Sequence, residues 1–186
     1  MNMLATQHGK PRAAVRRMGG LMMPDERLLR ALHNSRLLDK LSNSEIDILI
    51  SLVTVQHFDI QELVVGLDDE PFQDALIILI KGEIEVSAMV GNEPVSLHLV
   101  SSGDLARVIS FVGGDMINVS SSISIRQEST VLLLQRSRLE TLLNSHPSIV
   151  CRVLLNLVLH VHGVARSRNA QGELVKNYLH GMHGHY

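Results

Sequence analysis

The sequence is poor in several residue types that mark common protein classes. Of its 186 residues only Cys151 is a cysteine, none is tryptophan, and aromatic residues make up 3%. A single thiol excludes an intrachain disulfide and a zinc or iron–sulfur centre held only by this chain's cysteines. Because Cys151 lies in an apolar segment, we expect a buried and unreactive thiol. The cysteine content indicates a cytoplasmic protein.

A basic excess is also missing, since the net charge is -2 and the pI is near 6.5. Proteins that bind nucleic acid or anionic membranes usually carry such an excess. Apolar residues occur in strand-length or amphipathic patterns, so the sequence predicts no transmembrane helix. We therefore expect no direct DNA binding and no membrane association.

Changes in composition divide the chain into four parts. These are a flexible basic arm at 1–23, a β-rich domain with N-terminal helices at 24–146, a helix at 147–166 and a polar tail at 167–186. The tail contains His180, His183 and His185, which can bind a transition metal on a flexible chain, although a plain polar terminus is the favoured interpretation. No metal site is predicted.

The β-rich part is organised around residues 72–104. An apolar run from Ala75 to Ile80 precedes Lys81-Gly82, which predicts a tight turn, and alternating polar and apolar residues follow. Further strands are predicted at 53–58 and 63–65, as a hairpin, and at 95–100, 119–125 and 130–134. The pattern predicts antiparallel strands in a barrel or sandwich.

Helices flank these strands. A helix is expected from Pro24 to about Leu38, and two Ser-x-x-Glu capping boxes, Ser42 with Glu45 and Ser137 with Glu140, predict two more helix starts.

The helix after Pro147 is apolar on two flanks, which indicates two packing partners, the barrel and a second subunit. The sequence therefore predicts a homodimer. The predicted interface residues follow helical spacing: Val150, Leu154, Leu157, Val161 and Val164.

The order of these motifs over residues 25–166 resembles the cyclic-nucleotide-binding domain of Crp/Fnr-type regulators. The similar segments are Leu37-Leu38 with Ser44-Glu45-Ile46, Leu76-Ile77-Ile78-Leu79 before Gly82, Leu97-His98-Leu99 before Gly103-Asp104, and Arg138 to Leu143 before His146-Pro147. The resemblance implies a mainly β fold with flanking helices: a double-stranded β-helix, or jelly-roll barrel, with a long C-terminal dimerisation helix. Only about twenty residues follow Arg166, too few for the family's helix-turn-helix domain.

The phosphate-binding cassette of that family is altered here. In the family, the glutamate of a glycine-glutamate step accepts from the ribose hydroxyl, and the arginine of an arginine-serine step pairs with the phosphate. In this sequence the first step falls on about Arg107-Val108 and the second on about Ile117-Asn118. Two lost charge-assisted bonds of about 1.5–3 kcal/mol each would weaken binding at least a hundredfold. We therefore expect no binding of cAMP in the usual manner.

Three functions fit this pattern. The first is a non-enzymatic regulatory module that acts through dimerisation and contacts with an unidentified protein, without a cofactor. The second is a sensor of another nucleotide or acidic effector, with candidate ligand-binding residues Gly103, Asp104, Arg107, Asn118, Ser120 and Ser121. The third, a metal-dependent enzyme on a similar barrel, lacks the paired histidines that it needs, because His57 and His98 are isolated. The sequence favours the first.

Overall fold

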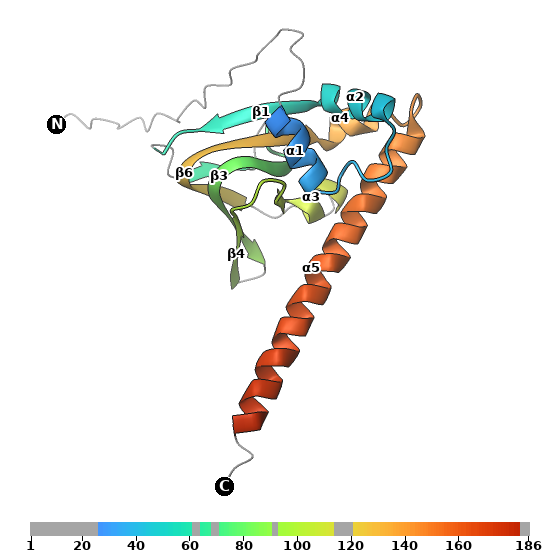
Figure 1. The fold of residues 1–186 in the computed structure, drawn as a ribbon. Helices are drawn as coiled ribbons and strands as arrows, with labels where there is room; N and C mark the ends of the chain where they lie inside the picture. Colours follow the sequence, from blue (N-terminus) through green and yellow to red (C-terminus); the bar gives the residue numbers. More distant parts are fainter. Residues whose placement is uncertain (1–25, 61–63, 68–70, 91–92, 114–120, 183–186) are drawn as a thin grey trace, which may run out of the picture.

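The computed structural model describes residues 26–60, 64–67, 71–90, 93–113 and 121–182. The elements in chain order are α1 (Glu26–Asn34), α2 (Asn43–Leu52), β1 (Val53–Phe58), β2 (Val64–Gly66), β3 (Ala75–Val90), β4 (Glu93–Leu99), β5 (Leu105–Ala106), α3 (Val108–Gly113), β6 (Ser121–Gln135), α4 (Arg136–Glu140) and α5 (Pro147–Met182). Figure 1 shows a rolled sheet with the short helices gathered at one end and α5 extending far beyond it. The predicted basic arm at 1–23 lies outside the described residues.

All described strand pairs are antiparallel. The main order is β1-β6-β3-β4, while β2 pairs with β6 and β5 pairs with β3. The long strands β3 and β6 form the centre, where Leu76 lies opposite Leu134 and Ile78 opposite Leu132. The predicted antiparallel sheet with flanking helices is therefore confirmed. The predicted hairpin of 53–58 with 63–65 is wrong, because β1 and β2 both pair with β6.

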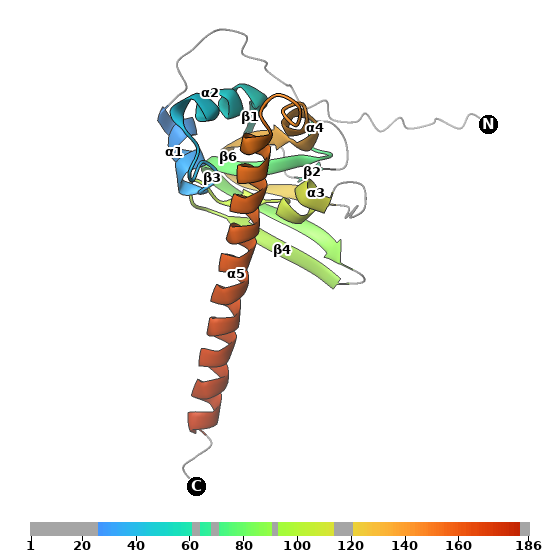
Figure 2. The same ribbon diagram turned by 90° about the vertical axis from the view of Figure 1, so that its right-hand side faces the viewer.

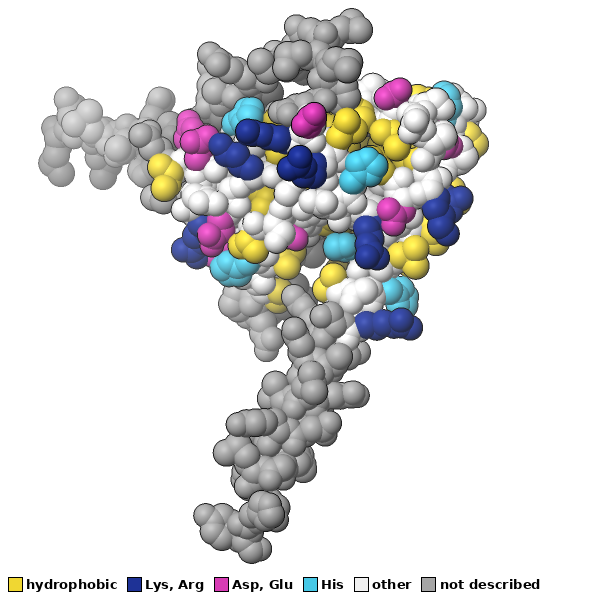
Figure 3. Space-filling view, viewed as in Figure 1, with side chains coloured by type: hydrophobic (Ala, Val, Ile, Leu, Met, Phe, Trp, Pro, Cys, Tyr) yellow, Lys and Arg dark blue, Asp and Glu magenta, His cyan; other side chains and the backbone are white. Residues whose placement is uncertain are grey.

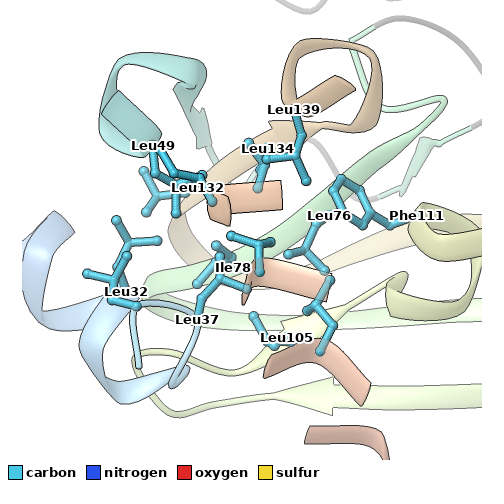
Figure 4. Packing of buried hydrophobic residues seen from close by; sticks show 14 of the residues in the cluster. Leu32, Leu37, Leu49, Leu76, Ile78, Leu105, Phe111, Leu132, Leu134 and Leu139 are labelled. Atoms are coloured by element: carbon cyan, nitrogen blue, oxygen red, sulfur yellow. The ribbon is translucent and has the colours of Figure 1, made fainter. Parts of the chain in front are cut away.

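The central strands are apolar on both faces because both faces are buried. Leu76 and Ile78 point into a cluster with the helices, whereas Ile77 and Leu79 point into the interior of the roll. Figure 4 shows the first cluster, to which Leu32 of α1, Leu49 of α2 and Phe111 of α3 contribute. Burial on both sides explains the uninterrupted apolar runs of the sequence.

Gly82 does not form the predicted turn. β3 continues through it, and the pairing with β6 shifts register between Leu79, Lys81 and Glu83. Gly82 has φ +104, and Ser129 of β6 packs so closely that a Cβ would lie 2.6 Å from its Cα. The glycine thus permits a β-bulge that bends the strand without ending it. Residues 119–125 and 130–134 were likewise predicted as two strands, but residues 121–135 form the single strand β6.

The helix ends follow the predictions in part. Ser42 caps α2 in a complete capping box with Glu45, as predicted. The predicted box at Ser137 is wrong: α4 begins at Arg136, and the Ser137 N–H donates to Asp74 Oδ2 at 3.0 Å. α1 ends at Asn34 instead of about Leu38, because the chain turns at Arg36, whose φ is 59.

α5 is longer than the sequence predicts. A helix of 36 residues runs without a break from Pro147 to Met182, through the predicted boundary at 166. In Figure 2 its first part crosses the roll and the remainder projects away from it. The predicted separate tail at 167–186 therefore continues the same helix as far as Met182.

Candidate functional site

The turn between β4 and β5 contains the candidate residues Gly103 and Asp104. Asp104 Oδ2 accepts from the backbone N–H groups of Val100 at 2.9 Å and Ser101 at 2.8 Å, so this carboxylate holds its own turn. The Gly103 N–H donates to the carbonyl of Leu79 at 2.8 Å, which attaches the turn to β3. In this structure Oδ2 of Asp104 is therefore used by the chain's own backbone.

Gly103 fits against the end of α1. Its φ is +98, and a Cβ would lie 2.5 Å from the Cβ of Asn34 and 2.7 Å from the N of Ser35. The Asn34 side chain also donates to the carbonyl of Ser102 at 3.0 Å. Glycine is required here for packing as well as for its φ, and the turn is held against α1.

Arg107 is the cation of the site and lies directly before α3. Its φ of 64 is in the left-handed region, which costs a non-glycine residue about 1–2 kcal/mol. The guanidinium donates to Ser121 Oγ at the start of β6 and to the carbonyl of Gln73 at 2.6 Å. Arg107 therefore connects three segments that are distant in sequence, and these bonds offset its backbone strain.

The structure brings Arg107 together with Ser121, and Gly103 with Asp104. Gln73 belongs to the same site through its carbonyl, and no sequence motif marks that contribution. Asn118 and Ser120 were also predicted as ligand-binding residues and lie outside the described residues, as does Ile117.

An apolar surface continues from Ser121 across the sheet. Ser121 lies opposite Ala88 of β3, which lies opposite Val95 of β4, so these three side chains share one face. On the same face Leu97 lies opposite the buried Val86. Val95 and Leu97 are 46% and 37% exposed. The site thus combines one arginine with exposed apolar side chains on the same face of the sheet.

The opposite face of these strands is polar. Glu85 of β3 bonds to Arg126 of β6 and lies 3.5 Å from His98 of β4. The Arg126 hydrogen bond lowers the pKa of the Glu85 carboxyl, and Ser96 contributes a second hydrogen bond. Figure 3 shows acidic, basic and histidine side chains interspersed over the face in view. Among the described residues no group of three or more His, Cys, Asp or Glu is placed to hold a metal ion.

α5 separates the predicted dimer residues into two sets. Val150 and Leu157 are 5% and 0% exposed and belong to the core of their own protomer, so their assignment to a dimer interface is wrong. Leu154, Val161 and Val164 remain exposed. The helix is rotated relative to the predicted seam, so that only part of that seam points outward.

Cys151 is exposed on α5, so the prediction of a buried thiol is also wrong. Its neighbour Val150 packs on the roll, whereas Cys151, one residue and 100° further around the helix, points away from it.

Asn156 is a functional candidate that the sequence reasoning missed. It is 7% exposed, and its Nδ2 donates to the carbonyls of Leu37 and Asp39, both at 3.0 Å. The signal was available, because a single amide interrupts an otherwise apolar helix face. The bonds attach α5 to the α1–α2 connection, residues 35–42.

By length and composition alone, Pro147–Val164 of α5 is apolar enough to cross a membrane, with a mean hydropathy of 1.4. Core helices pass the same test, and Ile149, Val153 and Leu157 are all fully buried against the protein. Packing on the roll accounts for the apolar character of that side of the helix.

Comparisons with known proteins agree with this architecture. No protein-family model and no curated protein matches the chain. A cyclic nucleotide-binding domain from Methylobacillus flagellatus KT matches with a TM-score of 0.60 at 21% identity, covering 82% of this chain and 83% of the other. The catabolite activator protein of Thermus thermophilus matches with a TM-score of 0.54 at 20% identity, covering 75% of this chain and 62% of the other. The chain therefore has the fold of cyclic-nucleotide-binding domains, a β-roll with flanking helices and a C-terminal helix.

Proposed function

We propose that this chain is a non-enzymatic regulatory module that acts as a homodimer and through protein contacts, and that it does not hold cAMP in the usual manner. The observation that carries the proposal is that the Arg107 guanidinium already bonds to Ser121 Oγ and to the Gln73 carbonyl. A cyclic phosphate would have to replace these bonds, each worth about 1.5–3 kcal/mol. The module would act in the cytoplasm without direct contact with DNA or a membrane.

The outer face of α5 supports dimerisation. Leu154, Val158 and Val161 are 36%, 47% and 41% exposed, and their 4-3 spacing is that of a coiled-coil seam. Cys151 precedes Leu154 by three residues and continues the seam toward the start of the helix. In a parallel pair of α5 helices the two Cys151 thiols would face each other.

Sedimentation velocity and mild oxidation test the dimer together. We expect a concentration-dependent dimer, and a disulfide-linked dimer on reducing-agent removal that is absent in Cys151→Ser. Leu155→Cys in the Cys151→Ser background is the matched control, because it lies on α5 at 45% exposure but off the 4-3 seam. A monomer at about 100 μM would contradict the proposal, since a stable interface of this kind binds far more tightly.

Calorimetric titration with cAMP, cGMP and cyclic dinucleotides tests the site. We expect no heat of binding from the folded dimer. The same titration of Arg107→Ala shows whether removing the arginine changes that result. Micromolar binding of cAMP by the wild type would contradict the proposed loss of nucleotide binding.

A sensor for a different effector is the second candidate, and the surface beside Arg107 favours it. The exposed side chains of Val95 and Leu97 lie on the same face as Ser121, the partner of Arg107. A ligand with an apolar ring and an acidic group would fit this combination. Binding of a panel member by the wild type that disappears in Arg107→Ala would support the sensor over the first proposal.

A further inference from the structure

Hydrophobicity alone does not determine which side of α5 faces the roll. Successive residues are 100° apart, and apolar side chains occur all around the helix between Ile149 and Val164. One continuous row at helical spacing is entirely apolar: Val150, Leu154, Leu157, Val161 and Val164. A helix placed by hydrophobicity alone would turn this whole row, including Leu154, toward the core.

The structure adopts a different rotation. Ile149 and Val153 are fully buried, and the next inward position of their row is the polar Asn156. Val150 and Leu157 of the apolar row are still buried, whereas Leu154 is turned out to 36% exposure. Beside the roll the chain therefore buries the Asn156 amide and leaves Leu154 exposed, which requires a specific compensating contact.

Asn156 supplies that contact. Its Nδ2 donates to the Leu37 and Asp39 carbonyls, so one amide nitrogen satisfies two backbone acceptors. Rotating α5 to bury Leu154 would break both bonds and leave the carbonyl of the buried Leu37 without this partner. Leu and Val packing is tolerant of such a rotation, but this pair of bonds is directional.

The accepting segment is held firmly. Its ends, Arg36 and Lys40, have φ of 59 and 64, which non-glycine residues keep only where the surroundings fix them. Leu37 and Leu38 between them are 1% and 3% exposed. The Leu37 N–H also bonds to Ser35 Oγ at 3.2 Å. Asn156 therefore binds to a fixed backbone target.

We propose that Asn156 is a positioning residue that sets the rotation of α5 on the roll and thereby presents Leu154, Val158 and Val161 to a second copy of the chain. Single buried asparagines set register in the same way in coiled coils. The identity of the partner rests on the proposed dimer, whereas the rotation of α5 does not.

Thiol labelling measures the rotation directly in the full chain. In a Cys151→Ser background, Val153→Cys reports the inward side, 0% exposed, and Leu159→Cys reports the outward side, 60% exposed. We expect labelling at 159 to exceed that at 153 by about 100-fold or more, because burial protects a thiol until the structure opens. Adding Asn156→Leu should reduce this ratio at least about tenfold, because the helix then samples other rotations.

Leu49→Ala is the matched control. Leu49 is fully buried in the same cluster on α2, so its truncation lowers stability without touching the Asn156 bonds. When each protein is labelled at a urea concentration equally far below its own unfolding midpoint, Leu49→Ala should retain the wild-type ratio of labelling at 159 to labelling at 153. A ratio in Asn156→Leu equal to that in Leu49→Ala would overturn the proposal.

Asn156→Ala is the second variant, since alanine preserves the helix and removes the amide. It should reduce the ratio as Asn156→Leu does. Loss of folding in both variants would assign Asn156 a general stabilising role and would also overturn the proposal. The labelling ratio can be measured in a monomer as well as in a dimer. A monomeric wild type with the expected ratios would therefore refute the proposed dimer but support the role of Asn156 in setting the rotation of α5.

Discussion

Two adjacent residues of α5 should respond in opposite ways to the same substitution. Leu157 is fully buried in the core shared with α1 and α2, whereas Val158 is 47% exposed on the outer face. We predict that Leu157→Glu unfolds the protein and that Val158→Glu leaves a folded monomer. The contrast separates the core face of the helix from the proposed dimer face.

The magnitudes follow from burial. Truncating a fully buried leucine costs about 2–5 kcal/mol, and a carboxylate in its place adds a desolvation cost. Because whole domains are stable by about 5–15 kcal/mol, Leu157→Glu should remove most of the stability. At Val158 the free energy of unfolding of the protomer should change by about 0.5 kcal/mol or less. Two buried valines, each worth about 1.5–3 kcal/mol, would be lost per dimer, which weakens association at least about 100-fold.

Urea unfolding and sedimentation velocity at several concentrations measure the two effects separately. Val158→Ala is the control, because it removes part of the apolar surface without adding charge and should weaken the dimer less. The reasoning is refuted if Val158→Glu dimerises with wild-type affinity, or if Leu157→Glu keeps the wild-type urea midpoint in a monomer.

Three further predictions concern stability. Gly82→Ala should lower the free energy of unfolding by about 1–3 kcal/mol in urea, because Gly82 has φ +104 and a Cβ there would lie 2.6 Å from the Cα of Ser129 in β6. Gly66→Ala is the control and should be almost neutral, because a Cβ at Gly66 would meet nothing within 4 Å. Hydrogen bonds from the Ser42 backbone and side chain lower the pKa of Glu45 below 4.5. Glu45→Gln should therefore lower the urea midpoint at pH 7, and the difference between wild type and variant should vanish as the pH falls through the lowered pKa. An equal difference at pH 7 and pH 2.5 would contradict this. Burial lowers the pKa of His160 below 6.5, so the unfolded chain binds the proton more readily and the free energy of unfolding should fall as the pH drops below 6.5. His160→Gln should reduce this dependence of the free energy of unfolding on pH between pH 7.5 and 5.5. An unchanged dependence would exclude His160 as its source.

The sequence predicted the strand positions better than their connections. The apolar runs at 75–80 and 130–134 are strands because both faces of the central sheet are buried. Gly82 was assigned to a turn, yet it forms a bulge within β3. A glycine with positive φ serves either purpose, and only the position of the partner strand β6 distinguishes them.

The candidate site was located only in part for a related reason. Sequence shows that Asp104 and Arg107 have groups suited to a ligand, but not which groups the chain itself will use. In the structure Asp104 accepts from its own turn, and Arg107 bonds to Ser121 and Gln73. Backbone acceptors such as the Gln73 carbonyl leave no trace in residue identity, so bonds of this kind are invisible before folding is known.

A short segment, the end of α1 and the α1–α2 connection, contacts both the Gly103 turn of the candidate site and α5. Asn34 donates to the carbonyl of Ser102, beside Gly103, and a few residues later the Leu37 and Asp39 carbonyls accept from Asn156. The turn at the candidate site and the rotation of α5 are therefore fixed by the same short segment. A ligand or partner that displaced the Gly103 turn would break its bond to Leu79 of β3 and the Asn34 bond to Ser102 together, so the sheet and this segment would respond at the same time.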